Sequence, residues 1–342
     1  MPSFCRHNRL IQNCPICSRE QSVELRPVVS SAVPKVSAPR PAGDAGRGGQ
    51  AAGAGAGSGG RRAGGGARSS GRGGGLKVRR LVRGAEDGYH SPLLPGLKSS
   101  ADADRLAHEL AFAEYRLELL ELDPPGLLAQ VAGDGDVEER TWLAFQIAYL
   151  SPLEDGDPFA AIDAVRTTWA SGELPDLADV RVGPRSPYEP ERGAGTLESY
   201  RAWAGRAGSQ AQAFTGEASW TPERRFARLF ERLALPGLNR DARYELLVLL
   251  GHTSVYDLRA ATLQLVGENE ATVAAKRVLG IGDSLLLDRR ATDLAEACQV
   301  PLESLDLALH NWGTGQRLHL GVPLGAEPEA GALDRVRGAL GL

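Results

Sequence analysis

The sequence predicts a mainly α-helical protein. From Ala103 onwards apolar residues recur at steps of three and four, the spacing of one face of a helix. The chain contains no clear run of alternating strands, no GxxxxGK phosphate loop and no serine nucleophile elbow. Its 342 residues are 42% hydrophobic, enough for one sizeable core or two small ones. We therefore expect a helical domain over residues 100–320 and a tail helix within 321–342.

Caps and apolar spacing set the expected elements in order. We expect helices over 103–122, 138–150 and 157–169. Three further helices should begin at Thr196, Thr221 and Asn239, and the helix that begins at Asn239 should end at Gly251. The last two helices are expected over 256–266 and 330–340. Residues 171–195 are rich in proline, glycine and charge, so we expect a long surface loop there. Residues 317–322 resemble a strand.

The most informative stretch runs from 235 to 313 and contains a Gly-x-Gly turn. Gly280 and Gly282 allow the backbone to turn sharply and to come close to a ligand, and Asp283 suits the N-cap of the following helix. Amides at such a turn, together with the helix dipole, favour an anion such as phosphate. The sequence therefore predicts two helices joined by a hairpin that can hold a phosphate.

Four basic residues flank this hairpin, and counterion release rewards such residues on nucleic acid. They are Lys276, Arg277, Arg289 and Arg290. The alternative is an ordinary tight turn between helices with solvated basic flanks. We interpret the four residues, with Gly280 and Gly282, as candidate DNA-binding residues.

Asp306 follows the hairpin on the next expected helix, after Pro301 in the link. An Asp in a helix is most often a solvated charge, and we keep Asp306 as the first catalytic candidate. Asp293, in the second helix of the hairpin, is the other catalytic candidate, although it can instead cap or pair with a neighbouring arginine. His310 lies one turn after Asp306, so the two can share a face and a hydrogen bond.

These residues together resemble the helix-hairpin-helix DNA glycosylases, in which a Leu-x-Gly-x-Gly hairpin precedes a catalytic Asp. Here Leu279–Gly282 supplies the two hairpin glycines and Asp306 the acid. The resemblance implies that the Asp306 carboxylate stabilises a cationic sugar or orients water as a glycosidic bond breaks. Ser284 stands near the position where bifunctional members carry a nucleophilic lysine, so the resemblance implies a monofunctional enzyme. From about Ala103 to Gly313 the chain also resembles the α-glutamyl/putrescinyl thymine pyrophosphorylase-like branch.

The branch resemblance implies that the helix around Trp142 helps to line a base pocket. Apolar spacing favours Trp142 as a core residue, and we keep Gln146, Tyr149 and His310 as pocket candidates. Trp312 is expected in the core. The expected function is a monofunctional base glycosylase acting on a modified base, in DNA repair or anti-phage defence. The alternatives are an enzyme that hypermodifies thymine and a non-catalytic zinc-containing DNA-binding module.

The N-terminal residues differ in composition from the rest. Residues 1–83 carry a net charge of +12, which leaves −16 for the remainder of a chain whose formal net charge is −4. We expect 21–83, rich in glycine, alanine and arginine, to be a disordered basic linker that meets DNA or serves as a spacer. No apolar run is long enough to span a membrane, and the N-terminus is not a secretory signal, so we expect a cytoplasmic protein.

Residues 1–20 predict a structural zinc knuckle. Two cysteines spaced by two residues can bind one ion, and a Cys-x-His pair can complete a tetrahedral site. The expected ligands are Cys5, His7, Cys14 and Cys17. A closed site of four ligands has no open position, so we assign Zn²⁺ no catalytic role; the alternative is a tail whose thiols bind metal loosely or not at all.

Overall fold

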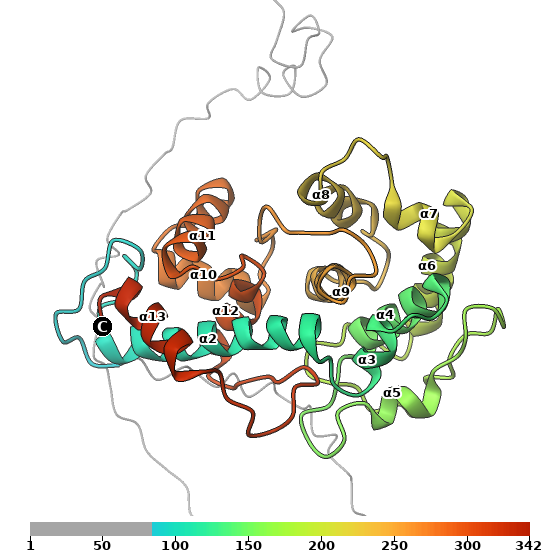
Figure 1. Ribbon diagram of the computed structural model, residues 1–342, viewed down its shortest axis with the longest axis horizontal. Coiled ribbons are helices and arrows are strands. Elements are labelled where there is room, and N and C mark those ends of the chain that lie inside the picture. Colours follow the sequence, from blue (N-terminus) through green and yellow to red (C-terminus); the bar gives the residue numbers. More distant parts are fainter. Residues whose placement is uncertain (1–83) are drawn as a thin grey trace, which may run out of the picture. The chain divides into compact units, whose positions relative to one another are not determined.

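The computed structural model describes residues 84–342. The zinc knuckle predicted at 1–20 and the linker predicted at 21–83 lie outside the described residues. Every helix or strand element in the described part is an α-helix, which confirms the mainly α fold class (Figure 1). In chain order the helices are α2 (Ser100–Leu122), α3 (Leu127–Ala132), α4 (Val137–Leu150), α5 (Ala160–Val165), α6 (Gly193–Ala207), α7 (Gln210–Thr215), α8 (Pro222–Arg232), α9 (Arg240–His252), α10 (Glu270–Leu279), α11 (Ser284–Cys298), α12 (Ser304–Thr314) and α13 (Ala330–Leu340).

Helix α2 is the long central element of this domain. It packs against α12 and α13 and also contacts α3 and α9. Helix α4 packs against α9. In Figure 1 the helices α10 to α13 gather around the N-terminal and middle parts of α2, and α3 to α9 lie towards its C-terminal end. Apolar side chains of α2 such as Leu106, Leu110 and Phe112 are fully buried. The core therefore runs continuously along α2 and joins the two groups of helices.

Local caps fix several helices where the sequence predicts them. The side chain of Thr221 accepts a hydrogen bond from the Arg224 amide at the start of α8, and that of Asn239 accepts one from the Ala242 amide at the start of α9. The helices predicted at 103–122 and 138–150 also form, as α2 and α4, and α13 covers residues 330–340 as expected. Trp142 and Trp312 are buried, as their predicted core positions require.

Other expectations are wrong. The helix expected to reach Trp169 ends at Val165, and α6 begins at Gly193, so Thr196 lies inside that helix instead of capping it. Helix α9 ends one residue after Gly251. The segments 256–266 and 317–322 form neither the predicted helix nor the predicted strand. The short helices α3 and α7 were not predicted.

The segment 256–266 leaves the helical conformation because other groups bind its backbone. Gln264 has a φ of 55°, in the left-handed region. The amide of Leu263 donates to Asp288, and its carbonyl accepts from Arg240. Side chains from α9 and α11 thus replace the hydrogen bonds that a helix would make, so periodicity alone misleads here.

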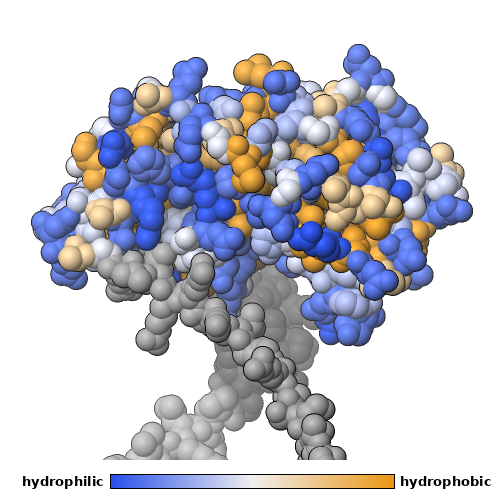
Figure 2. All heavy atoms as spheres, turned by 90° about the horizontal axis from the view of Figure 1, so that it is seen from below, coloured by the Kyte–Doolittle hydropathy of each residue, from blue (hydrophilic) through white to orange (hydrophobic). Residues whose placement is uncertain are grey.

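The surface is mostly hydrophilic. Figure 2 shows one face of the domain, on which polar residues surround several separate apolar patches. The large apolar side chains with the greatest exposure are Leu122, Val266, Leu285, Leu286, Leu324 and Leu342. Among the helices of residues 84–342, none combines the length and apolarity needed to cross a membrane.

Candidate functional site: the basic hairpin and the Asp306 cluster

The predicted hairpin joins α10 to α11, and we call it, with its four basic flanking residues, the basic hairpin. Gly280 takes a left-handed conformation, with φ 64° and ψ 22°, immediately after α10 ends. Asp283 caps α11, because its side chain accepts a hydrogen bond from the Leu286 amide at 3.0 Å. The Gly96 amide donates to the Val278 carbonyl at 3.0 Å, and a Cβ on Gly96 would lie 1.8 Å from the Arg277 carbonyl oxygen. A second glycine, distant in sequence, therefore supports the turn.

Gly282 differs from Gly280. It does not have a positive φ, and a Cβ added to it would meet no atom within 4 Å. Neither the turn nor internal packing requires glycine at this position. The absence of a side chain leaves the exposed hairpin backbone open to close approach from outside.

The cationic side chains around the hairpin are exposed, and within residues 84–342 none of them forms an ion pair. They are Lys276 and Arg277 in the last turn of α10, and Arg289 and Arg290 on α11. Asp293, the second catalytic candidate, is also exposed on α11. The alternative considered for Asp293, an ion pair with Arg289 or Arg290, does not form within the described residues.

Asp306 has the opposite environment. It lies in the first turn of α12 with only 2% of its surface exposed. One carboxylate oxygen accepts a hydrogen bond from Arg185 at 2.7 Å, and the other accepts from Arg240. Although burial opposes ionisation, the two guanidinium groups hold the pKa of Asp306 well below its usual range.

Asp306 is part of a larger buried network, which we call the Asp306 cluster. Arg185 also lies 3.7 Å from Asp241 and 3.8 Å from Glu245, and Glu245 pairs with Arg116. The cluster therefore contains three arginines and three carboxylates: Arg116, Arg185, Arg240, Asp241, Glu245 and Asp306. Their formal charges cancel, as burial in a core demands.

The cluster joins distant parts of the chain. Arg116 comes from α2, Arg240 from α9 and Asp306 from α12, and Arg185 comes from the loop between α5 and α6. The Arg240 guanidinium also lies over the Tyr244 ring, 4.5 Å from its centroid. These contacts fix the relative positions of the helices around Asp306.

His310 lies beside the cluster but does not form the predicted hydrogen bond with Asp306. Both carboxylate oxygens of Asp306 are occupied by the arginines, and Nδ1 of His310 has no hydrogen-bond partner within the described chain. Burial, and next the positive charge of Arg185, lower the pKa of His310 to about 4. The imidazole is therefore neutral at neutral pH.

The hairpin and the cluster are connected through the segment 263–265. Asp288, on the second turn of α11, accepts a hydrogen bond from the Leu263 amide at 3.1 Å. Arg240 donates to the carbonyl oxygens of Leu263 and Gln264, the latter at 3.3 Å, and pairs with Asp306. A continuous set of polar contacts thus runs from the hairpin helix to the buried carboxylate.

The two pocket candidates on α4 lie in different surroundings. Tyr149 lines a cavity of about 460 Å³ together with Ser186 and Asn239, the sequence neighbours of Arg185 and Arg240. Gln146 is buried, and its amide exchanges hydrogen bonds with the backbone of Thr167, at 3.1 and 3.2 Å. Gln146 therefore anchors the following loop, whereas Tyr149 lines the cavity although only 1% of its surface is exposed.

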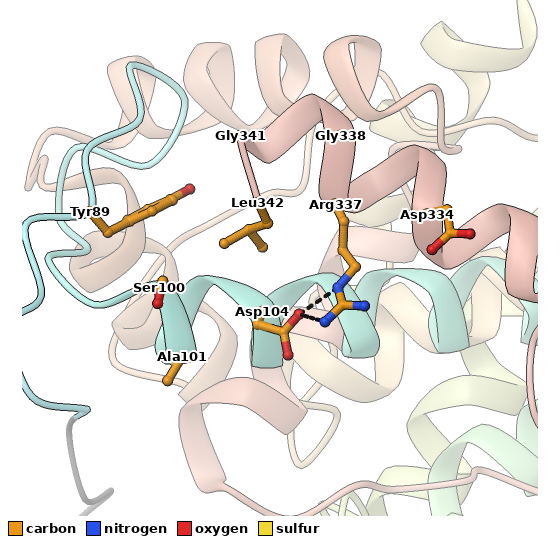
Figure 3. A pocket seen from close by; sticks show the side chains of 9 residues that line it. All are labelled: Tyr89, Ser100, Ala101, Asp104, Asp334, Arg337, Gly338, Gly341 and Leu342. Carbon is orange, nitrogen blue, oxygen red and sulfur yellow. Dashed lines mark hydrogen bonds and ion pairs between the residues drawn. The ribbon is translucent and has the colours of Figure 1, made fainter.

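A second cavity, of about 610 Å³, lies between α2 and α13 (Figure 3). Its lining includes Tyr89, Asp104 and Arg337, and Arg337 bridges the two helices by binding Asp104 at 2.6 Å. None of the predicted site residues lines this cavity. We therefore regard it as a gap between the two helices and assign it no function.

The arginines of the cluster could not be predicted from the sequence. Arg185 and Arg240 are 121 and 66 residues from Asp306, and neither belongs to a local motif. The predicted zinc ligands Cys5, His7, Cys14 and Cys17 lie outside the described residues. Within 84–342, no group of three or more His, Cys, Asp or Glu side chains could hold a metal ion.

Comparison of the chain with family models, with curated proteins and with solved structures finds no match.

Proposed function

We propose that residues 84–342 form a DNA-binding domain that acts as a monofunctional base glycosylase. The observation that carries the proposal is the basic hairpin. Gly280 makes the turn, Asp283 caps α11, and four exposed cations next to the turn have no ion-pair partner in the described chain. The amides at the α11 N-terminus that the Asp283 side chain does not bind favour a phosphate, and the cations gain from counterion release.

Asp306 is the proposed catalytic carboxylate. Its lowered pKa keeps it ionised throughout the physiological pH range, so it can stabilise positive charge on the deoxyribose. In the proposed step the bond between C1′ and the base nitrogen breaks, and its electron pair leaves with the base. A water oxygen then bonds to C1′, and the water proton passes to the departing base or to solvent.

This chemistry requires a change in the cluster. Arg185 and Arg240 together cancel the charge of Asp306, and no described cavity includes the carboxylate. Arg185 is the better candidate to leave, because it comes from a loop and its Nε and Nη1 atoms make no hydrogen bond. A DNA phosphate would offer Arg185 another anion, and Asp306 would then face the sugar with its charge less compensated.

The alternative, a DNA-binding module without catalysis, has an observation in its favour as well. Both carboxylate oxygens of Asp306 accept hydrogen bonds from arginines, and the residue is 2% exposed. Such an arrangement can serve stability alone. The two functions share the hairpin and differ only in whether Asp306 meets a substrate.

One experiment separates them. Full-length protein is incubated with normal DNA and with DNA carrying phage-modified bases, and released bases are measured by mass spectrometry. We expect the wild type to release a modified base and Asp306→Asn to release none while still binding DNA. The matched control Asp334→Asn, at an exposed carboxylate of α13, should behave as wild type. Thermal melting of each variant shows whether it is folded. Binding without base release by the wild type would leave the binding module as the function.

Zinc at the N-terminus remains a proposal based on the sequence. We expect one Zn²⁺ per chain, and none after Cys14 and Cys17 are changed to serine. Elemental analysis of the purified chain and of this variant tests it.

A further inference from the structure

Two exposed leucines follow the hairpin directly. Leu285 and Leu286, in the first turn of α11, are 81% and 51% exposed. The core side of α11 is formed instead by Leu287, Ala291, Leu294 and Cys298, which repeat at helical spacing and are buried. The two leucines therefore contribute little to the core. A single exposed leucine is ordinary, but two neighbours at the tip of a hairpin form a small apolar surface.

The surroundings of these leucines are cationic. Arg289 lies one helical turn after Leu285, and Arg290 one turn after Leu286, so each leucine shares a side of α11 with an arginine. Lys276 and Arg277 lie just before the hairpin, at the end of α10. The described residues as a whole are strongly acidic in sequence, so this local set of unpaired cations stands out.

Gly282 adds a third feature. An added Cβ there would meet nothing within 4 Å, so the exposed side of the hairpin next to Leu285 has space for a close approach. An apolar tip, an accessible backbone and unpaired cations are combined within residues 276–290. A polyanion with stacked, partly apolar rings matches all three.

We propose that Leu285 and Leu286 form an apolar wedge that enters duplex DNA at a base step next to the phosphate held by the hairpin. The proposal rests on the proposed DNA binding of the basic hairpin and adds a local action on the duplex. Apolar side chains inserted between base pairs unstack the step, and an unstacked base is easier to extrude. The wedge would thus prepare a nucleotide for the enzyme.

A protein partner is the other conceivable occupant of this apolar surface. The charge pattern favours DNA, because Lys276, Arg277, Arg289 and Arg290 all lack an acidic partner in the described chain and a nucleic acid supplies one phosphate per nucleotide. A symmetric contact between the hairpins of two copies would bring these cations against one another. Protein association is therefore kept as an outcome of the test.

The test uses full-length protein and duplex DNA that carries 2-aminopurine, whose fluorescence rises when the base is unstacked. Protein is added to saturation, so that differences in affinity do not affect the signal. We expect the wild type to raise the fluorescence severalfold and the double variant Leu285→Ser/Leu286→Ser to bind without this rise. Leu122→Ser is the matched control, because Leu122 is 84% exposed at the far end of α2, and it should behave as wild type.

The outcomes distinguish a failure of the wedge proposal from a failure of the proposed DNA binding. Wild-type binding without a fluorescence rise, or a full rise with the double variant, would overturn the wedge and leave DNA binding intact. Failure of the wild type to bind DNA would overturn both. Light scattering tests the protein contact. If the wild type self-associates, the double variant does not, and the wild type unstacks no base, the leucines form a protein contact and the wedge is overturned. Circular dichroism confirms that each variant is folded.

Discussion

The basic hairpin and the Asp306 cluster treat charge in opposite ways. At the hairpin, four cationic side chains are exposed and have no ion-pair partner in the described chain. In the cluster, three arginines and three carboxylates lie together and each is paired, and all are buried except the partly buried Asp241. The hairpin is built from neighbours in sequence, whereas the cluster draws on α2, α9, α12 and the loop before α6.

Under the proposed function, this difference separates the region that binds DNA from the region that stabilises the fold. A buried charge without a partner is costly, so the members of the cluster must be matched, and removing one leaves another exposed to that cost. Exposed cations carry no such requirement and contribute little to folding when they are unpaired. Substitutions in the cluster should therefore change stability, and substitutions at the hairpin should change DNA binding.

The largest expected effect is on stability, from Arg240→Ala. This change removes one partner of the Asp306 carboxylate and two hydrogen bonds to the 263–264 backbone. We expect a decrease of about 3–5 kcal/mol in the free energy of unfolding. Arg289→Ala, at an exposed position, should change it by less than about 0.5 kcal/mol. Urea unfolding measures both variants, and an equal loss of unfolding free energy in the two would contradict the proposed difference between the two regions.

A smaller effect is expected from pH. The pKa of His310 in the folded chain, about 4, lies below the ordinary value of 6.5. Between pH 6.5 and pH 4 the imidazole is therefore protonated in the unfolded chain and neutral in the folded chain. Stability is therefore present above pH 6.5 and is lost as the pH falls towards 4, by roughly 2–3 kcal/mol. The pKa of His252 is also lowered by burial, and it adds to this decrease.

His310→Gln isolates the contribution of His310, because glutamine does not titrate. The slope of unfolding free energy against pH between 6.5 and 4 should become shallower than in the wild type, whatever the absolute stability of the variant. An unchanged slope would mean that His310 takes up a proton in the folded state as easily as in the unfolded one. Urea unfolding at several pH values provides the slope.

The cap of α11 should have a smaller effect still. Asp283→Ala removes the hydrogen bond to the Leu286 amide and should cost about 1 kcal/mol of stability. Ser284→Ala, at the next position, makes no such bond and is the control. If the two variants are equally stable, Asp283 does not act as the cap.

Local signals in the sequence account for what could be predicted. Gly280 and Asp283 mark the end of α10 and the start of α11, and Asn239 marks the start of α9, because caps act within a few residues. The same reasoning failed for 256–266, where Arg240 and Asp288 bind the backbone from other helices. Tertiary contacts of this kind leave no local pattern.

The candidate site divides in the same way. The position of Asp306 on a helix after the hairpin followed from the sequence, but its burial between Arg185 and Arg240 did not, because those arginines are far away along the chain. The predicted hydrogen bond between Asp306 and His310 does not form, because both carboxylate oxygens accept hydrogen bonds from these arginines. Gly96 also left no signal, since its role depends on packing against the end of α10.

The salt dependence of DNA affinity tests the central claim, that the unpaired cations of the hairpin bind DNA phosphates. The wild type is compared with the variant in which Lys276, Arg277, Arg289 and Arg290 are all changed to alanine, by titrating fluorescent duplex DNA between about 50 and 200 mM salt. We expect weaker binding by the variant. Its slope of log affinity against log salt should be shallower by about 0.9 for each phosphate that the variant no longer neutralises, or up to roughly 3.6 in all. Stability should hardly change. Equal affinity and equal slope for the two proteins would contradict the account.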